Sequence, residues 1–476
     1  MPAERWLFTL ALELRVHTAP VPTSPTNHRN PAAQAAGRKE TPMLEATRYS
    51  DPELYAIVSD EFNRQQDNLE MIASEGTVPH EVLELNGCVF TNKTTEDAPG
   101  RRFQAGSKEA DRLENLAIAR AKEVFGAEHA NVQPYSGTMA NYAVFAAVLQ
   151  PGDTVLSMSP QQGGHLTHGS PDNFLSKVYS FVQYGVNRET EHIDYGQVEE
   201  LAMRHKPRLI VAGASAYPRL IDFAAMRKIA DSCGALLLAD IAHTAGLVAA
   251  KVIPSPVPYS DFVSSSTAKT FCGSRGGFVL CKAEQAAILD RGVFPGTLSA
   301  IHLPAIAANA FCMRYVATNA FRMIMERVLR NAATLASALE ERGFRLVSGG
   351  TDTHLLLVDL RPKGISGKVF QHALEIAGIT VNRNLIPFDP AKASETSGVR
   401  VGLTRISQRG IEEKKMIKIA DIMNSVAENH DNSQVLDICR EKVRELLAEY
   451  PLYPVEHSTP KAHALPNVLP LQRESA

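Results

Sequence analysis

The fold is decided by one short stretch of the chain, Ser266-Thr267-Ala268-Lys269-Thr270-Phe271. It follows the apolar run Asp261-Phe262-Val263, and a glycine-rich turn at 272–277 leads from it into a second apolar run at 278–281. Two strand-like runs around a tight turn place the lysine at a strand end, among small and hydroxylated side chains. An amine in such a dry place can lose its proton and attack a carbonyl group, although most lysines are ordinary surface residues.

Pyridoxal phosphate (PLP) is the cofactor that a reactive lysine of this kind indicates, and it requires three further groups. Ser136-Gly137-Thr138 stands at the start of an expected buried helix, where free N–H groups and the helix dipole can hold a phosphate. Asp240 closes the apolar run 235–239 and would keep the pyridine nitrogen protonated, at the strand end where α/β sheets bind ligands. His165, in a loop rich in glycine and hydroxylated residues, is the candidate for stacking on the ring.

Each of these three segments also has an ordinary explanation, since helix N-caps, capping aspartates and structural histidines are commoner than cofactor ligands. A metal ion is a further explanation for the pair His165 and His168. No cysteine or carboxylate stands near this pair at a ligand spacing, so we expect no metal site. The occurrence of all three segments together with Lys269 favours the PLP site.

With these segments in place, the chain resembles the serine hydroxymethyltransferase family, within the fold type I (aspartate-aminotransferase-like) PLP enzymes. The resemblance spans about 50–445, and the matching blocks are LEMIASE (69–75), FGAEHANVQ (125–133), PGDTVL (151–156), GGHLTHGSP (163–171), LIVAGASAYPR (209–219), AHTAGLVAA (242–250) and SGVRVG (397–402). It implies an α/β fold, with a mostly parallel seven-stranded sheet in a large domain and a smaller C-terminal α+β domain.

The resemblance also assigns roles, residue by residue. Lys269 would carry the cofactor as an imine, Asp240 would bind the pyridine nitrogen, and Glu96 would move protons around the hydroxymethyl group and folate. The residues assigned to the cofactor are Ser136, Gly137, Thr138, His165, Ser215, Asp240, His243 and Lys269. Those assigned to the amino-acid substrate are Ser74, Thr94, Gln104, Arg275 and Arg400, and those assigned to folate are Glu96, Phe103, Leu166 and Asn384. The implied catalytic set is Lys269, Glu96, His165, Asp240 and His243.

The chain departs from the family pattern around the amino-acid and pterin pockets. Where the family has tyrosines, this chain has Thr94, Ala98, Phe103 and Gln104. The family's histidine before the imine lysine is Ala268, and its Gln-Gly-Gly-Pro is Leu298-Ser299-Ala300-Ile301. These changes remove volume beside the substrate Cα, and a pocket distinguishes one methyl group by only about 1–3 kcal/mol. An α-substituted substrate is therefore favoured.

We expect a hydroxymethyltransferase that interconverts 2-methylserine and D-alanine with tetrahydrofolate, as some members related to this family do. Retention of Glu96, Phe103 and Asn384 favours folate as the one-carbon acceptor. An ordinary serine/glycine hydroxymethyltransferase is the first alternative. A folate-independent aldolase or transaldolase of β-hydroxy amino acids is the second. A cofactor-binding protein without activity is disfavoured, because a retired site should have lost some of its residues.

Composition excludes several classes of partner. A hydrophobic content of 44% and a charged content of 21% are typical of a globular protein. The net charge of −3 indicates neither nucleic acid nor a membrane surface as partner. No run is long and apolar enough to span a membrane, and we expect no signal peptide. The six cysteines show no metal spacing and suit a cytoplasmic enzyme.

The chain of 476 residues is long enough for two domains. We expect a disordered tail at 1–43, an N-terminal arm and large PLP-binding domain at 44–330, a small domain at 331–452 and a tail at 453–476. Strands are expected at 154–158, 209–213, 235–240, 262–266, 278–281, 345–347, 353–358 and 399–403, and helices at 110–125, 321–339 and 436–449. The family shares its sites between subunits, so a homodimer (or dimer of dimers) is expected.

Overall fold

The computed structural model describes residues 44–453. Contacts divide the chain into two compact units between Asn63 and Arg64, and each is described by itself. The described part of the first unit holds α2 (Glu45–Ser50) and most of α3 (Pro52–Asp67). The tails expected at 1–43 and beyond 453 lie outside the described residues.

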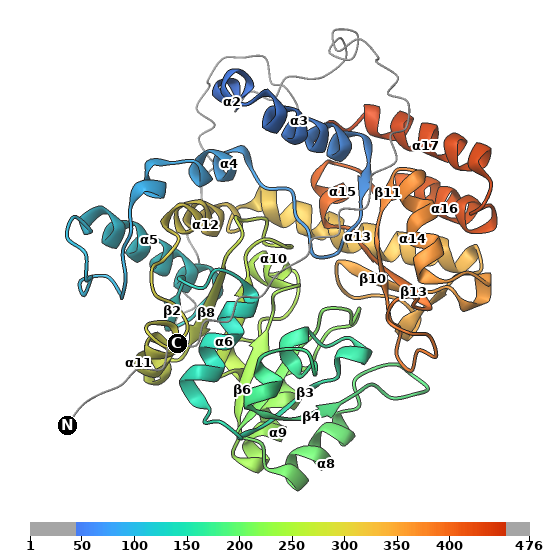
Figure 1. Cartoon of the computed structure of the whole chain (residues 1–476). Coiled ribbons are helices and arrows are strands. Elements are labelled where there is room, and N and C mark those ends of the chain that lie inside the picture. Colours follow the sequence, from blue (N-terminus) through green and yellow to red (C-terminus); the bar gives the residue numbers. More distant parts are fainter. Residues whose placement is uncertain (1–43, 454–476) are drawn as a thin grey trace, which may run out of the picture. The chain divides into compact units, whose positions relative to one another are not determined.

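A seven-stranded sheet forms the centre of the second unit, in the order β2-β8-β7-β6-β5-β3-β4 (Figure 1). Its strands are β2 (His129–Asn131), β3 (Thr154–Met158), β4 (Ser180–Tyr184), β5 (Leu209–Gly213), β6 (Leu236–Asp240), β7 (Phe262–Ser266) and β8 (Gly277–Cys281). Strands β4, β3, β5, β6 and β7 run parallel, whereas β8 is antiparallel to both β7 and β2. The prediction of an α/β fold with a mostly parallel sheet is confirmed.

Helices cover both faces of the sheet, so its strands are buried on both sides. Their apolar composition suits them to this position. Strand β5 is buried along its whole length. The helices α4 (His80–Asn86) and α5 (Lys108–Phe125) precede the strands. Those between and after them are α6 (Gly137–Val148), α7 (Leu175–Val178), α8 (Tyr195–His205), α9 (Phe223–Cys233), α10 (Ala245–Ala249), α11 (Ala286–Val293) and α12 (Leu303–Tyr315). Side-chain N-caps fix where several begin: Ser136 for α6, Asp194 for α8 and Asp222 for α9.

A second, four-stranded sheet follows the long helix α13 (Asn319–Glu341). It is antiparallel, in the order β12 (Asn382–Asn384), β13 (Gly398–Gly402), β10 (Leu355–Asp359) and β9 (Arg345–Leu346). Four helices lie in the same part of the chain as this sheet (Figure 1): α14 (Gly367–Ile376), α15 (Thr404–Gln408), α16 (Glu413–Glu428) and α17 (Ser433–Ala448). A short parallel pair, β1 (Leu69–Glu70) with β11 (Ile379–Thr380), completes the strands of the described chain.

The predicted strands lie within one or two residues of the observed ones. One local difference is Val347, predicted to be in a strand, which instead begins a 3-10 turn containing Ser348 at a φ of 58°. The predicted domain division at 330/331 falls inside α13, and it stays a prediction. Among residues 44–453, the structure has no helix with the length and apolar character needed to cross a membrane.

Gly246 in α10 allows this helix to approach the lysine-bearing turn closely. A Cβ at this position would lie 2.1 Å from the carbonyl oxygen of Thr270, which is a backbone atom and cannot move away cheaply. The backbone N–H of Gly246 also donates to the Thr270 hydroxyl at 3.0 Å. The packing of α10 against the residue that follows Lys269 therefore requires glycine.

Replacing Gly246 with alanine should destabilise the protein by about 1–3 kcal/mol, because the added methyl group forces backbone apart. The matched control is Gly196→Ala, since Gly196 is exposed in α8 and a Cβ there meets only the Asp194 carboxylate at 3.4 Å. The control should be neutral or stabilising by up to about 1 kcal/mol. Urea unfolding measures both, and equal stabilities of the two variants would contradict this packing argument.

Candidate active site

A cavity of about 160 Å³ lies where the central parallel strands end. The described residues that line it are Ser136, Gly137, Thr138, His165, Ala214, Ser215, Asp240, Ala242, His243, Ser266 and Lys269. All eight residues assigned to the cofactor are in this set. Parallel strands place their carboxyl ends at one edge of a sheet, which is why residues so far apart in sequence meet.

Asp240 is the last residue of β6, and donors surround its carboxylate. Asn141 Nδ2 donates to Oδ2 at 2.8 Å, His168 Nε2 lies 3.1 Å from the same oxygen, and the Ala242 N–H donates to Oδ1 at 3.0 Å. Burial by itself would raise the pKa of Asp240. The hydrogen bonds from His168 and Asn141 outweigh it and hold this pKa well below its ordinary value. The carboxylate is therefore ionised.

The hydrogen bonds of His168 and His165 fix their tautomers. The backbone N–H of His165 donates to His168 Nδ1 at 3.1 Å, so the proton of His168 is on Nε2 and faces Asp240. The backbone N–H of Thr167 donates to His165 Nδ1 at 3.2 Å. Burial lowers the pKa of His165 to about 4, which leaves its ring neutral and flat beside the cavity.

The fold brings Asp240 close to His165 and His168, a proximity that the sequence spacing did not reveal. Their potential ligand atoms lie within 4.8 Å of one another. Both ring nitrogens of His168 already take part in hydrogen bonds, one as acceptor and one as donor, so this ring has no lone pair to offer a cation. The arrangement is a hydrogen-bond network that supports a carboxylate.

Asn141 in α6 is a central residue that the sequence analysis did not identify. Its amide donates to both Asp240 and Thr167, each at 2.8 Å, and its carbonyl accepts from the Ser264 hydroxyl at 2.5 Å. It therefore links α6, the His165 loop, β6 and β7. An asparagine inside an otherwise apolar helix needs buried partners, and this requirement was the signal that could have found it.

Lys269 is held in a turn with many internal hydrogen bonds. The Gly273 N–H donates to the Thr267 carbonyl at 2.7 Å, and the Cys272 N–H donates to the Lys269 carbonyl at 3.0 Å. Gly76 packs on the same carbonyl, since a Cβ there would lie 2.3 Å from it. Burial of the amine lowers the pKa of Lys269 to about 8, the charge of Asp240 opposing and that of Arg400 reinforcing this effect.

Arg400 lies on β13 of the second sheet and contacts Ser215, which lines the cavity, but is not itself among the described lining residues. Its Nη1 donates to the Ser215 carbonyl at 2.5 Å and its Nε to Asn382 Oδ1 at 3.1 Å. Burial lowers its pKa to about 10, so the guanidinium stays charged near neutral pH. A buried cation with donors left over is suited to bind a carboxylate.

Ser74 lies beside the strand that carries Arg400, because Ala73 packs directly on Gly402 of β13. The Ala73 carbonyl accepts from His354 Nε2 at 3.1 Å, and this nitrogen lies 3.4 Å from Nδ1 of His243. Burial lowers the pKa of His243 well below its ordinary value and that of His354 to about 3, so both rings are neutral. His354 is a second residue that the sequence analysis missed.

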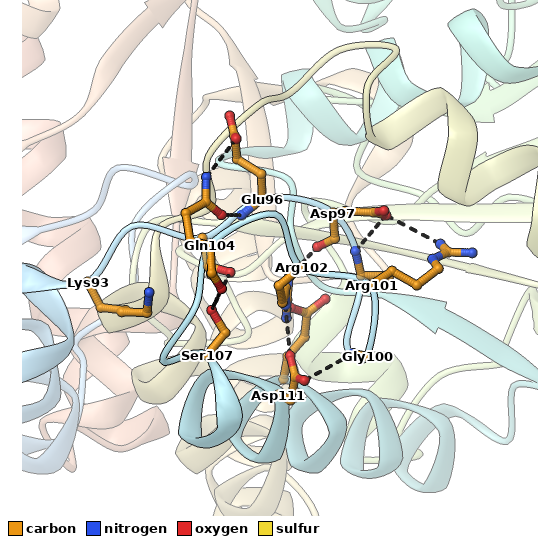
Figure 2. Close-up of polar contacts among 12 residues, drawn as sticks. Lys93, Glu96, Asp97, Gly100, Arg101, Arg102, Gln104, Ser107 and Asp111 are labelled. Atoms are coloured by element: carbon orange, nitrogen blue, oxygen red, sulfur yellow. Dashed lines mark hydrogen bonds and ion pairs between the residues drawn. The ribbon is translucent and has the colours of Figure 1, made fainter.

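The residues assigned to the hydroxymethyl group and folate are arranged differently. Thr94, Glu96, Phe103, Gln104 and Arg275 are not among the described residues that line the 160 Å³ cavity. Glu96 and Gln104 lie in a separate loop, where they bond to one another (Figure 2). Phe103 is 72% exposed and its ring centroid lies 5.8 Å from that of Phe294.

Three other assigned residues have distinct positions. Arg275 lines another cavity, of about 510 Å³, together with Tyr135. Leu166 follows His165 directly and is 61% exposed. Asn384 is on β12, next to β13, and its side-chain amide donates to the Leu385 carbonyl at 2.7 Å.

The serine hydroxymethyltransferase family model matches residues 47–423. Members of this family are PLP-dependent hydroxymethyltransferases that use tetrahydrofolate as co-substrate. The 160 Å³ cavity fits PLP: it combines a lysine of lowered pKa, an ionised aspartate, and the start of α6, where first-turn N–H groups have no helical acceptor. A Cβ on Gly137 would lie 3.2 Å from the Ser266 side chain, so glycine keeps the start of α6 close to the end of β7.

The attachment of PLP to Lys269 should speed up as pH rises, with a midpoint at about 8, because the neutral amine is the reactive form. Arg400→Met should raise this midpoint, since the guanidinium lowers the pKa of Lys269. Arg383→Met, at an exposed position of the neighbouring strand, is the matched control and should not move it. Stopped-flow absorbance measures the rate, and a midpoint at the ordinary lysine value of about 10.4 would refute the effect of burial.

Proposed function

Because the chain belongs to the serine hydroxymethyltransferase family, we propose that it acts on 2-methylserine, releasing D-alanine and passing the hydroxymethyl carbon to tetrahydrofolate. The observation that carries the proposal is the cavity in which all eight residues assigned to the cofactor meet. The substrate preference rests on the smaller residues that replace tyrosines and a histidine of the family in this chain.

PLP supplies an electron sink for the charge left on Cα when the Cα–Cβ bond breaks. Asp240, ionised and held by three donors, keeps the proton on the pyridine nitrogen. His165 offers a neutral flat ring, and the N–H groups at the start of α6 hold the phosphate. These residues position the cofactor before any substrate arrives.

The substrate carboxylate pairs with Arg400, with Ser74 as its second contact. A fixed carboxylate orients the Cα–Cβ bond, which is the main contribution that positioning makes to the rate. The β-hydroxyl must lose its proton as the carbon leaves, and Glu96 moves this proton and those of folate. His243, neutral and close to the cavity, completes the set beside Lys269.

The preference for 2-methylserine follows from side-chain volume. Thr94, Ala98 and Gln104 replace tyrosines of the family, and Ala268 replaces a histidine next to Lys269. The space that these rings vacate can hold an α-methyl group. An ordinary serine/glycine enzyme is the alternative within the family, and a folate-independent aldolase or transaldolase is the alternative outside it.

We propose a homodimer, or a dimer of dimers, with shared active sites. Glu96 and Phe103 lie outside the cavity of their own chain, and Phe103 is largely exposed, as residues that complete a neighbour's site would be.

A large domain at 44–330 and a small one at 331–452 remain part of the proposal. All six cysteines are free thiols, which supports a cytoplasmic location.

A spectral titration tests the reaction. D-alanine should change the absorption of the bound cofactor more strongly than glycine or L-serine, and tetrahydrofolate should enhance the change. Lys269→Ala should lack both the cofactor's lysine-bound absorption and turnover. A response to glycine and serine alone would identify the ordinary enzyme, and full turnover without tetrahydrofolate would identify the aldolase.

Refilling the pocket tests the substrate preference. Thr94→Tyr should lower kcat/KM for 2-methylserine relative to L-serine by about 10–100-fold, because the ring returns to the space of the α-methyl group. Thr94→Ser keeps the pocket open and is the matched control. If the ratio of the two kcat/KM values is the same in Thr94→Tyr and in the unaltered protein, the volume argument fails.

A further inference from the structure

The carboxylate of Glu96 is held on both of its oxygens. Gln104 Nε2 donates to Oε2 at 2.7 Å, while Gln104 Oε1 accepts the backbone N–H of Glu96 at 2.9 Å (Figure 2). The Ser299 hydroxyl donates to the other carboxylate oxygen, Oε1. Gln104 is thus fixed at both ends of its amide, and it can present only its N–H group to the carboxylate.

The segment that carries Ser299 is attached to the Glu96 loop by its backbone. Glu96 and Ala300 form an antiparallel bridge, and the Ile301 N–H donates to the Thr95 carbonyl at 3.1 Å. The Tyr135 hydroxyl, from the residue before Ser136, donates to the Ala300 carbonyl. Ser299 therefore approaches Glu96 from a fixed position. Its segment is also connected, through Tyr135, to the loop that is assigned to the phosphate.

We propose that Gln104 and Ser299 are positioning residues that hold Glu96 as an ionised proton acceptor, an assignment that rests on the proposed function. Both residues stand where the chain departs from its family, which has tyrosine and the Gln-Gly-Gly-Pro segment there. A glutamine amide is not ionisable, whereas a tyrosine hydroxyl is a weak acid with a pKa of about 10. Gln104 therefore orients Glu96 without competing for the proton that Glu96 moves.

No ion pair to Glu96 exists among residues 44–453, and hydrogen bonds set its charge state. The bond from Ser299 and then that from Gln104 lower its pKa, and partial burial opposes them. The charged and titratable groups around it have other partners: Lys93 donates to the Thr94 and Ala105 carbonyls, Arg101 pairs with Asp97, Arg102 pairs with Asp111 and Glu114, and Tyr135 donates to Ala300. Among the described residues of 298–301, no side chain titrates, and the adjacent His302 lines the 510 Å³ cavity. The lowered pKa should accordingly be insensitive to salt.

The test is the titration of Glu96 itself, in protein labelled with ¹³C-glutamate, with Glu96→Gln identifying the signal. Ser299→Ala and Gln104→Met each remove donors while keeping similar volume, so each should raise the pKa of Glu96, and the double variant should raise it further. Ser299→Thr keeps the hydroxyl and should restore the low value. Ser107→Ala is the matched control, because Ser107 bonds to the Gln104 carbonyl without touching Glu96.

The pH profile gives an independent measurement. The acid limb of kcat/KM should move to higher pH in Ser299→Ala and Gln104→Met, by the same shift as the ¹³C titration, and should not move in Ser107→Ala. A pKa of Glu96 that is unchanged in both variants overturns the proposal. Absence of hydroxymethyl transfer from any amino acid, with the ¹³C shifts as expected, would contradict the proposed function and leave the hold on Glu96 supported.

Discussion

The charge on Asp240, inside the protein at the end of β6, is the constraint on which the site depends. Its side chain is only 8% exposed, and an isolated carboxylate there would be too costly to keep ionised. Asn141 and His168 supply the compensating hydrogen bonds. These donors have their own partners, so the carboxylate fixes the relative positions of α6, the His165 loop, β6 and β7.

The Asp240 carboxylate also affects the pKa of Lys269, the amine across the cavity. Burial and Arg400 both lower the pKa of Lys269, while Asp240 raises it. Just above neutral pH, the amine is therefore close to half neutral. Neither the lowering by burial and Arg400 nor the raising by Asp240 would produce this state by itself. The Arg400 guanidinium, bonded to the carbonyl of the lining residue Ser215, stays charged beside the cavity, so an anion, a titrating amine and a cation lie close together.

The apolar strand runs and the glycine-rich turns were sufficient to predict the fold, since their periodicity records which faces are buried. Several strands were not predicted, among them β2 and β12, which have three residues each, and β4, which is exposed at its first residue. The residues around Asp240 could be predicted because they follow strand ends. Asn141 gave one signal, as a polar residue in an apolar helix, but its partners and those of His354 lie far away in sequence and only the folded chain brings them together.

The Glu96 loop shows the limit of motif matching most clearly. Its residues could be aligned with a family, but the motif gave no sign that Gln104 bonds to Glu96 or that Ser299 approaches from two hundred residues away. Such contacts depend on backbone pairing between 95–96 and 300–301. Two of the substitutions, Gln104 and Ser299, supply in the structure hydrogen-bond donors to Glu96.

The account is tested most directly by reducing the purified protein with borohydride in the presence of PLP and locating the modified residue by mass spectrometry. A lysine of lowered pKa beside an ionised aspartate should carry the label, so a single modified peptide containing Lys269 is the predicted result. Label spread over surface lysines, or none at all, would contradict it.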